Sequence, residues 1–195
     1  MPKISGYGKA AIFELEDLER LYHYMGSDRN KLFYSLLRYT GERISAICKL
    51  EWKCCYERKG KPRKIILYPA KSRKASPQGK RYSREVPAHP RLREELLKYD
   101  FDPLYSRYLF PGITFDKPMV RQTGHLILDR GLEASGLKDR GYSSHSFRRT
   151  LITLLHEKGI SARQIQGVTG HASLSSVQEY LEYNETEIAE AISLL

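Results

Sequence analysis

Two short runs of β-branched and aromatic residues constrain the fold of this chain most, because they are the segments whose composition favours strands over helices. The runs are KIILYPA, residues 64–70, and SREVPAHP, residues 83–90. The polar segment between them, residues 71–82, contains Pro77 and Gly79, as the tip of a hairpin commonly does. The sequence therefore predicts one small antiparallel sheet, around which the remaining elements are arranged.

The rest of the chain has helical periodicity, with apolar residues three or four positions apart. In the longest such stretch, Asp28 is a suitable N-cap and Gly41 interrupts the pattern. The predicted helical segments are residues 13–25, 28–52, 89–99, 120–137 (with breaks), 146–158, 162–168, 174–183 and 185–195. The expected fold class is therefore α+β, mostly α-helical with a small antiparallel β-sheet.

The charge of the chain indicates the class of its partner. Its 33 Lys and Arg residues exceed its 23 Asp and Glu residues, which gives a net charge of +10. Many of the cations lie between Arg58 and Arg84, whereas acidic residues gather near both ends, in FELEDLER and NETEIAEA. Such a basic stretch favours a polyanionic partner through phosphate contacts, although a solvated basic hairpin remains an alternative.

Composition also limits which cellular compartment and which cofactors we expect for this chain. No apolar run approaches the roughly 18 residues of a membrane span, and the N-terminus lacks the apolar core of a secretory signal. The cysteines, two of them adjacent at Cys54 and Cys55, form neither a disulfide framework nor a zinc motif. We therefore expect a cytoplasmic protein with reduced thiols and without a metal or other cofactor.

The segment HSFRRTLITLLHEKG, which begins at His145, combines a core helix with charged residues at its start. We expect Ser144 to be the N-cap of this helix. The predicted core face consists of Phe147, Leu151, Leu154 and Leu155. His145 and Arg148 lie on the flank of that face in the first turn, where free N–H groups and the helix dipole favour an anion. They are a candidate phosphate site, and the alternative is a second capping residue beside a surface cation.

The segment SARQIQGVTGHASLSSVQEYLEYN contains two helical stretches separated by a glycine turn, which is also the pattern of a helix-turn-helix. His171 follows the turn, and we expect Leu174, Val177 and Leu181 to form the core face of the second helix, with Tyr180 at its edge. A tyrosine hydroxyl is a poor nucleophile at its usual pKa of about 10 and needs cationic neighbours to act as one.

These elements together resemble a known catalytic set. TGERIS at Thr40–Ser45, HSFR at His145–Arg148, GH at Gly170–His171 and the following Tyr180 occur in the order and spacing of the tyrosine recombinases, or phage integrases. The basic hairpin ending in VP lies between the first two, as it does in that family. The resemblance covers nearly all of the chain and implies the fold of the family's catalytic domain.

The resemblance implies a role for each matching residue. Arg43 and Arg148 would bind the non-bridging oxygens of a scissile DNA phosphate, and Tyr180 would attack phosphorus to leave a 3′-phosphotyrosyl bond. His145 would act as general acid and base, and His171 would donate to a phosphate oxygen. Lys71 would protonate the departing 5′-oxygen, with Lys74 and Lys80 as alternatives in the same loop. Further DNA contacts are expected from Lys74, Lys80, Arg81 and Arg149, and the reaction would need neither ATP nor a metal.

The resemblance also carries expectations about organisation. Residues 1–195 would form a single catalytic domain without the family's N-terminal core-binding domain, and residues 184–195 would form a helix that docks on a neighbouring subunit or on its own domain. Double-stranded DNA would be the partner, with a homotetramer on DNA and a monomer in isolation. Ala46 departs from the pattern, since the family often has an acidic residue there. Two alternatives remain, a non-catalytic helix-turn-helix protein and an enzyme similar to type IB topoisomerases.

Overall fold

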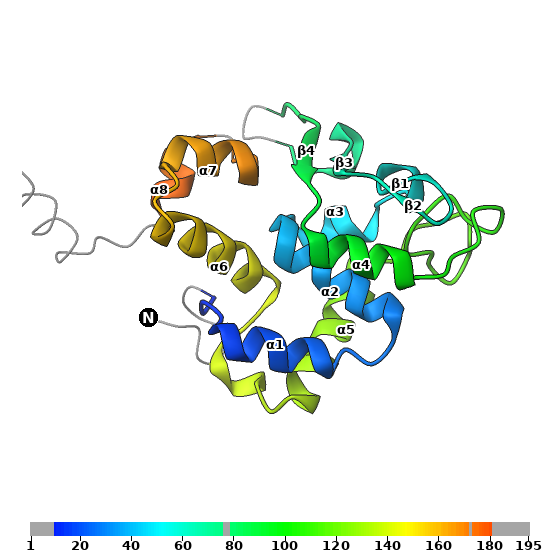
Figure 1. Ribbon diagram of the computed structural model, residues 1–195, viewed down its shortest axis with the longest axis horizontal. Helices are drawn as coiled ribbons and strands as arrows, with labels where there is room; N and C mark the ends of the chain where they lie inside the picture. The colour runs from blue at the N-terminus through cyan, green and yellow to red at the C-terminus, as the bar shows by residue number, and fades with distance from the viewer. Residues whose placement is uncertain (1–9, 76–78, 172, 181–195) are drawn as a thin grey trace, which may run out of the picture. The chain divides into compact units, whose positions relative to one another are not determined.

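The computed structural model describes residues 10–75, 79–171 and 173–180, and it divides the chain into two compact units (Figure 1). The first unit extends to Leu151 and the second begins at Ile152, so the long helix α6 belongs to both. The helices are α1 (Leu15–His23), α2 (Asp28–Thr40), α3 (Ile44–Cys48), α4 (Pro90–Lys98), α5 (Arg121–Ala134), α6 (Ser144–Glu157), α7 (Ala162–Thr169) and α8 (Ser175–Gln178). The strands are β1 (Tyr56–Arg58), β2 (Lys61–Pro62), β3 (Ile65–Tyr68) and β4 (Arg84–Pro87). Short 3-10 turns lie at Trp52–Cys54, Ala70–Ser72 and Lys138–Arg140.

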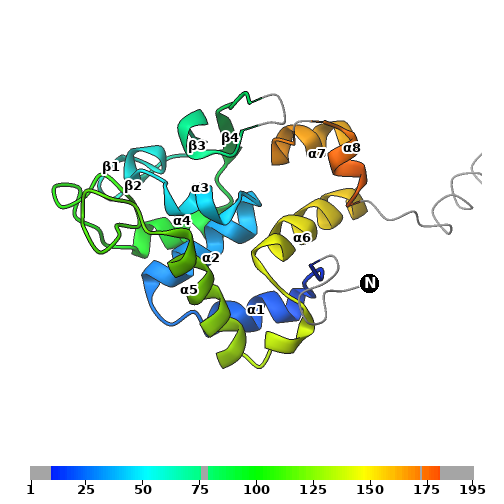
Figure 2. The same cartoon turned by 180° about the vertical axis from the view of Figure 1, so that it is seen from behind.

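Helix α2 forms the centre of the first unit. It packs against α4, seen in front in Figure 1, and contacts α5, seen in front in Figure 2. Consecutive residues from Leu32 to Leu37 are buried, which means that α2 is covered on several sides. The helix is capped by Ser27, whose hydroxyl accepts from the Asn30 N–H at 3.3 Å. The sequence-based expectation of Asp28 as the cap was therefore wrong by one residue, since Asp28 is already inside the helix.

The predicted hairpin is confirmed, but it is accompanied by a second one. β3 and β4 pair antiparallel from Ile65 opposite Pro87 to Tyr68 opposite Arg84. β1 and β2 form a separate two-stranded antiparallel sheet around Gly60, whose φ of 74° suits a tight turn. The prediction of one sheet missed this hairpin because its strands are short and polar and carry no β-branched run.

Helix α5 was expected to contain breaks and is instead one continuous helix. Its glycines are sites of close packing. A Cβ on Gly124 would lie 3.0 Å from Cys48 Sγ, and a Cβ on Gly131 would lie 2.9 Å from Met25 Sδ. Both glycines therefore let neighbouring segments approach the helix closely, which local propensity does not reveal.

The second unit has its own small core. Ile152, Ile165 and Val177 are buried against one another, and the partly buried Leu155 and Tyr180 pack on them. Ser161 and Gln164 form a capping box at the start of α7, and Gly170, with a φ of 63°, ends it. The predicted helix over residues 174–183 is described only as α8, since residues 181–183 lie outside the described part.

Two of the predicted core faces need correction. On α6, Phe147 is buried as expected, but Leu151, Leu154 and Leu155 are only half-buried, and Ile152 takes the buried position. On α8, Val177 is buried as expected, whereas Leu174 is exposed. The buried face of α6 is therefore rotated from the predicted one, since Ile152 is buried in place of Leu151.

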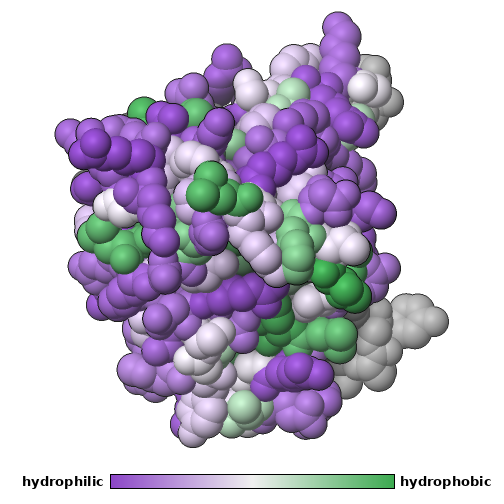
Figure 3. Space-filling model, turned by 90° about the vertical axis from the view of Figure 1, so that its right-hand side faces the viewer, coloured by the Kyte–Doolittle hydropathy of each residue, from purple (hydrophilic) through white to green (hydrophobic). Residues whose placement is uncertain are grey.

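The surface is mostly hydrophilic. On the face shown in Figure 3, hydrophobic side chains form separate patches among charged and polar ones. The most exposed apolar residues, Leu104 and Ile113, lie in the connection between α4 and α5. No helix among the described residues is long and apolar enough to cross a membrane.

Candidate active site

The segment Thr40–Arg43, which connects α2 to α3, positions the first candidate arginine. Gly41 adopts a φ of 58° and its N–H donates to the Leu37 carbonyl, so the chain leaves α2 in the left-handed conformation. Arg43 follows as the N-cap residue of α3 and is only partly buried. The sharp turn thus places Arg43 at a helix start, where an anion is electrostatically favoured.

Arg148 is held against the same segment. It is 3% exposed, and its Nη1 donates to the carbonyl of Gly41 at 2.9 Å. Helix α6 starts at Ser144, and the His145 N–H donates to the hydroxyl of Ser143 at 3.3 Å. The capping hydroxyl therefore belongs to Ser143, and the expectation of Ser144 was wrong by one residue.

His145 lies within the positive field of these arginines. Its side chain reaches solvent, yet partial desolvation lowers the pKa of its imidazole, and the charges of Arg43 and Arg148 lower it further. Two cationic groups on α5, His125 and Arg121, act in the same direction. The first unit therefore brings Arg43, His145 and Arg148 near one another.

Arg121 and His125 are neighbours of this cluster that sequence reasoning missed. They lie four positions apart at the start of α5, a spacing that puts both on one face of a helix. The pKa of His125 is itself lowered by burial and by Arg121. Their spacing was the available signal, but only the fold brings that face of α5 toward His145.

A buried carboxylate stands directly before Arg43. Glu42 is 2% exposed, and its Oε2 accepts from Arg84 Nη1 at 2.9 Å and from Arg73 Nε at 3.1 Å. Its Oε1 accepts from the backbone N–H of Arg43 at 2.9 Å. Burial alone would raise the pKa of Glu42, but Arg84 and Arg73 hold it below its usual value. Ala46 is buried and apolar, so the acidic group near Arg43 comes from Glu42.

The connection between β3 and β4 carries the candidate general acid. Lys71 Nζ forms an ion pair with Glu51 Oε1 at 2.6 Å, and its side chain is 68% exposed. The hydrogen bond to Glu51 and its charge raise the pKa of Lys71. The backbone carbonyl of Lys71 accepts from Arg81 Nη1 at 3.4 Å. Lys74, Lys80 and Arg81 are exposed on the same connection, as expected for residues that would contact DNA.

Arg149, a further candidate for DNA contact, has a different environment. It is 7% exposed, and its Nη1 donates to the backbone carbonyl of Ala10. This burial argues against a direct contact between Arg149 and DNA and indicates that Arg149 ties the N-terminal segment to α6.

In the second unit, His171 and Tyr180 lie side by side. Their ring centroids are 5.5 Å apart with an interplanar angle of 50°. His171 Nδ1 is 2.6 Å from the hydroxyl of Thr169, which in turn donates to the Ile165 carbonyl and so fixes the ring on α7. Tyr180 is partly buried against the small core, with its N–H bonded to the Val177 carbonyl. The two candidate residues of this unit are therefore juxtaposed.

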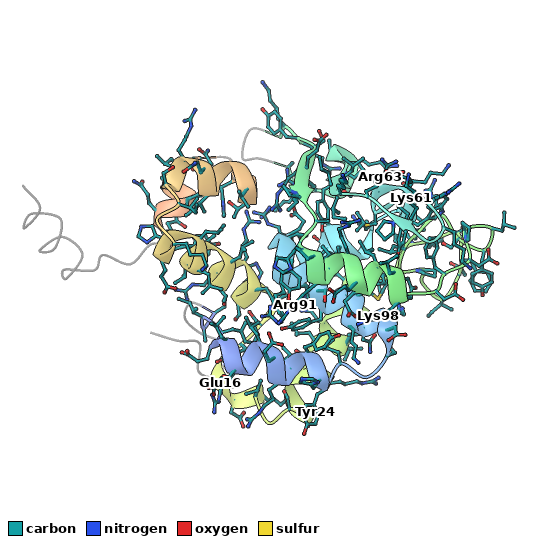
Figure 4. The ribbon with its side chains drawn as sticks, viewed as in Figure 1. Glu16, Tyr24, Lys61, Arg63, Arg91 and Lys98 are labelled. Atoms are coloured by element: carbon teal, nitrogen blue, oxygen red, sulfur yellow. The ribbon has the colours of Figure 1, made fainter. Side chains whose placement is uncertain are left out.

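Several other surface cations are engaged in ion pairs within the chain. Figure 4 labels Arg91 and Lys98 on α4 and Lys61 on β2. Arg91 pairs with Glu19, Lys98 pairs with Glu95, and Lys61 pairs with Glu57. Each of these cations has an acidic partner within the chain, as Lys71 does.

Comparison with known proteins places this arrangement in a family. The model of the phage integrase family matches residues 12–187. A tyrosine recombinase of Pseudothermotoga lettingae is 28% identical over 182 residues, covering 92% of this chain and 58% of that protein. The tyrosine recombinase XerC of Corynebacterium glutamicum is 27% identical over 166 residues, covering 85% of this chain and 50% of that protein. The chain thus spans between about half and three fifths of the length of these relatives.

Solved structures agree on the fold. The crystal structure of the XerA recombinase has a TM-score of 0.71 at 21% identity, over 97% of this chain and 66% of that one. The XerH site-specific recombinase, bound to its difH substrate in a pre-cleavage complex, has a TM-score of 0.72 at 21% identity, over 97% of this chain and 57% of that one. At this level of identity the likeness establishes the fold class, which is the one the sequence predicted.

Proposed function

The chain belongs to the phage integrase family of tyrosine recombinases, and from this premise we propose that it cleaves and rejoins DNA through a covalent 3′-phosphotyrosyl intermediate. The observation that carries the proposal is the cluster of Arg43, His145 and Arg148 around the turn at Gly41. Arg148 is held by the Gly41 carbonyl, and Arg43 and His145 lie near it, so the three groups together suit a phosphate.

In the proposed reaction the arginines bind the scissile phosphate. Arg43 and Arg148 each donate to non-bridging oxygens, which gain negative charge as the attacking oxygen approaches phosphorus. A guanidinium suits this role because its planar fork is always charged and matches two oxygens at once. Because Arg148 is held by the Gly41 carbonyl before DNA binds, little reorganisation is needed in the transition state.

Tyr180 is the proposed nucleophile. Its oxygen forms a bond to phosphorus, the bond from phosphorus to the 5′-oxygen breaks, and the phenolic proton passes to His145, whose lowered pKa favours the neutral, proton-accepting form. His171, beside Tyr180, donates to a phosphate oxygen. Rejoining reverses these steps, since the phosphotyrosyl bond conserves the energy of the phosphodiester.

Lys71 is the proposed general acid for the departing 5′-oxygen. Its ammonium transfers a proton to that oxygen and leaves a free 5′-hydroxyl. One of the three N–H donors of the Lys71 ammonium is engaged by Glu51 at 2.6 Å, and the side chain is 68% exposed, so the group can also meet the DNA. Replacing Lys71, Lys74 and Lys80 one at a time with Ala separates the candidates, since only loss of the general acid lowers the cleavage rate at saturating DNA.

The proposed partner is double-stranded DNA, bound by a monomer that assembles into a homotetramer when two sites are paired. The proposed compartment is the cytoplasm, consistent with the buried free thiols of Cys48, Cys54 and Cys55. Docking of the segment 184–195 on a neighbouring subunit or on its own domain stays a prediction, and that segment lies outside the described residues.

A covalent trapping assay tests the proposed function. The protein is incubated with nicked duplex DNA from a broad sequence pool, denatured in detergent and examined for attached DNA, beside Tyr180→Phe and Tyr183→Phe. We expect an adduct that only Tyr180→Phe abolishes. If only Tyr183→Phe abolished the adduct, the reaction class would stand and Tyr183 would be the nucleophile. A folded protein that binds DNA but forms no adduct would contradict the proposal and favour the helix-turn-helix reading.

A further inference from the structure

We infer that Glu42 is a positioning residue that couples both ends of the β3–β4 connection to the phosphate-binding Arg43. The inference rests on the proposed function, because it assigns Glu42 a role in holding two parts of the same catalytic machinery. The observation behind it is a single buried carboxylate that binds groups from three places in the chain.

The contacts of Glu42 use both carboxylate oxygens. Oε1 holds the N–H of Arg43 at the start of α3, and Oε2 holds Arg73 and Arg84 at distances of 3.1 and 2.9 Å. Arg73 follows Lys71 by two residues, whereas Arg84 is the first residue of β4. The carboxylate therefore joins the beginning and the end of the β3–β4 connection to the backbone of Arg43.

The two arginines extend this connection. Arg84 Nη2 also donates to the carbonyl of Thr40 at 2.6 Å, so it holds the segment that precedes Arg43 from its other side. Arg73 Nη1 donates to the carbonyl of Tyr82 at 3.0 Å, which draws the two ends of the β3–β4 connection together. A displacement of either end is thus transmitted to the segment Thr40–Arg43.

Burial makes these contacts rigid. Glu42, Arg73 and Arg84 are 2%, 8% and 5% exposed, so water cannot readily replace a lost partner. An ionised carboxylate in such a place requires its hydrogen bonds, and removing it takes from two buried guanidinium groups the carboxylate that both contact. The cluster also keeps a surplus of one positive charge, one carboxylate against two guanidiniums, beside the arginine that would bind phosphate.

The mechanism needs such a coupling because two groups act on opposite sides of one phosphate. Arg43 stabilises the charge on the non-bridging oxygens, and Lys71 protonates the departing oxygen in the same step. A catalytic group displaced by about 1 Å costs on the order of 100-fold in rate. Through Glu42, the position of the connection that carries Lys71 is set relative to Arg43.

Single-turnover cleavage of nicked DNA tests the inference, with Glu42→Gln and Arg73→Met compared with wild type. We expect the rate at saturating DNA to fall between about 10- and 100-fold in each variant, with the Kd for DNA changed less than about threefold. The defects should not add in the double variant, because both break one network. Glu85→Gln, an exposed glutamate on β4, and Arg130→Met, an exposed arginine on α5, should cleave at the wild-type rate.

A modified substrate distinguishes coupling from a local effect on Arg43. When sulfur replaces the bridging 5′-oxygen, the leaving thiolate needs no proton, so the general acid becomes unnecessary. We expect this substrate to restore much of the cleavage rate of Arg73→Met and Glu42→Gln. An equal defect with both substrates would overturn the coupling, as would cleavage of the ordinary substrate at the wild-type rate by folded variants.

Amide hydrogen exchange tests the coupling without any need for cleavage. Arg73 does not contact the Arg43 amide, but it holds Glu42, which accepts from that amide. Loss of the charge-assisted hydrogen bond between Arg73 and Glu42 in Arg73→Met should therefore accelerate exchange of the Arg43 amide by at least about tenfold. The Gly170 amide, bonded to Gln166 in the second unit, should keep its rate. If wild type forms no DNA adduct while the Arg43 amide responds, the proposed function fails and the coupling stands. An unchanged Arg43 amide overturns the coupling, whatever the cleavage assay gives.

Discussion

Replacing Gly41 with Ala tests the reasoning about the turn that presents Arg43. Gly41 has a φ of 58°, and a Cβ built on it would lie 2.8 Å from Leu151 Cδ2. Two separate effects therefore act on the variant. The left-handed backbone costs an L-residue about 1 kcal/mol, and shifting the tip of the half-buried Leu151 side chain costs about 1 kcal/mol more. We expect Gly41→Ala to lower the free energy of unfolding by about 2 kcal/mol.

Gly26→Ala is the matched control for Gly41→Ala. Gly26 also has a positive φ, 76°, but nothing lies within 4 Å of a Cβ placed there. It should therefore show only the backbone cost, and urea denaturation of both variants measures the difference. Adding Leu151→Ala to Gly41→Ala should remove the crowding part, which a double-mutant cycle isolates.

The outcome also bears on the candidate site. Because the Gly41 carbonyl accepts from Arg148, a displaced turn should slow cleavage more than the loss of stability explains. Equal destabilisation by Gly41→Ala and Gly26→Ala, within about 0.5 kcal/mol, would refute the argument that close approach to Leu151 restricts position 41 to glycine.

Three further predictions concern charge. The pKa of Glu42 is lowered, so this carboxylate stabilises the fold above the ordinary pKa of 4.5, and the stabilisation is lost as the pH falls through the lowered pKa. In urea denaturation at a series of pH values, Glu42→Gln should therefore lose less stability on acidification than wild type does. An NMR titration should give His145 a pKa below 6.5, and this pKa should rise toward 6.5 in Arg43→Gln. An unchanged pKa in the variant would show that the charge of Arg43 does not act on His145. Replacing both Lys74 and Arg81 with Gln should reduce the slope of log K for DNA binding against log salt concentration by about 0.9 per lost phosphate contact. An unchanged slope would show that these two residues do not contact DNA phosphates.

Local patterns predicted most of the secondary structure. The β3–β4 hairpin, α4 and α7 lie where β-branched runs, periodicity and caps indicated. Some of the failures arose because the deciding contact comes from elsewhere in the chain. Breaks were expected within residues 120–137, but α5 is continuous, and its Gly124 and Gly131 are sites where another segment packs closely. β1 and β2 were missed because their polar strands carry no local signal.

The candidate catalytic residues were also chosen from the sequence, and their roles remain predictions. Arg43, His145 and Arg148 lie near one another in the first unit, and His171 lies beside Tyr180 in the second. Arg149 shows the limit of such reasoning, because it was expected to contact DNA, whereas the fold buries it and its guanidinium donates to the Ala10 carbonyl.

The sequence by itself determined the family of this protein and the candidate catalytic residues, since the residue types and spacing of TGER, HSFR, GH and Tyr180 are properties of the chain. Only the tertiary structure decided what surrounds those residues. Glu42 meets Arg73 and Arg84 across separations of 31 and 42 residues, and no local pattern indicates such a meeting. The physical reason is burial. A carboxylate removed from water must find charged partners wherever the fold supplies them, so its environment is set by packing and not by neighbours in the sequence.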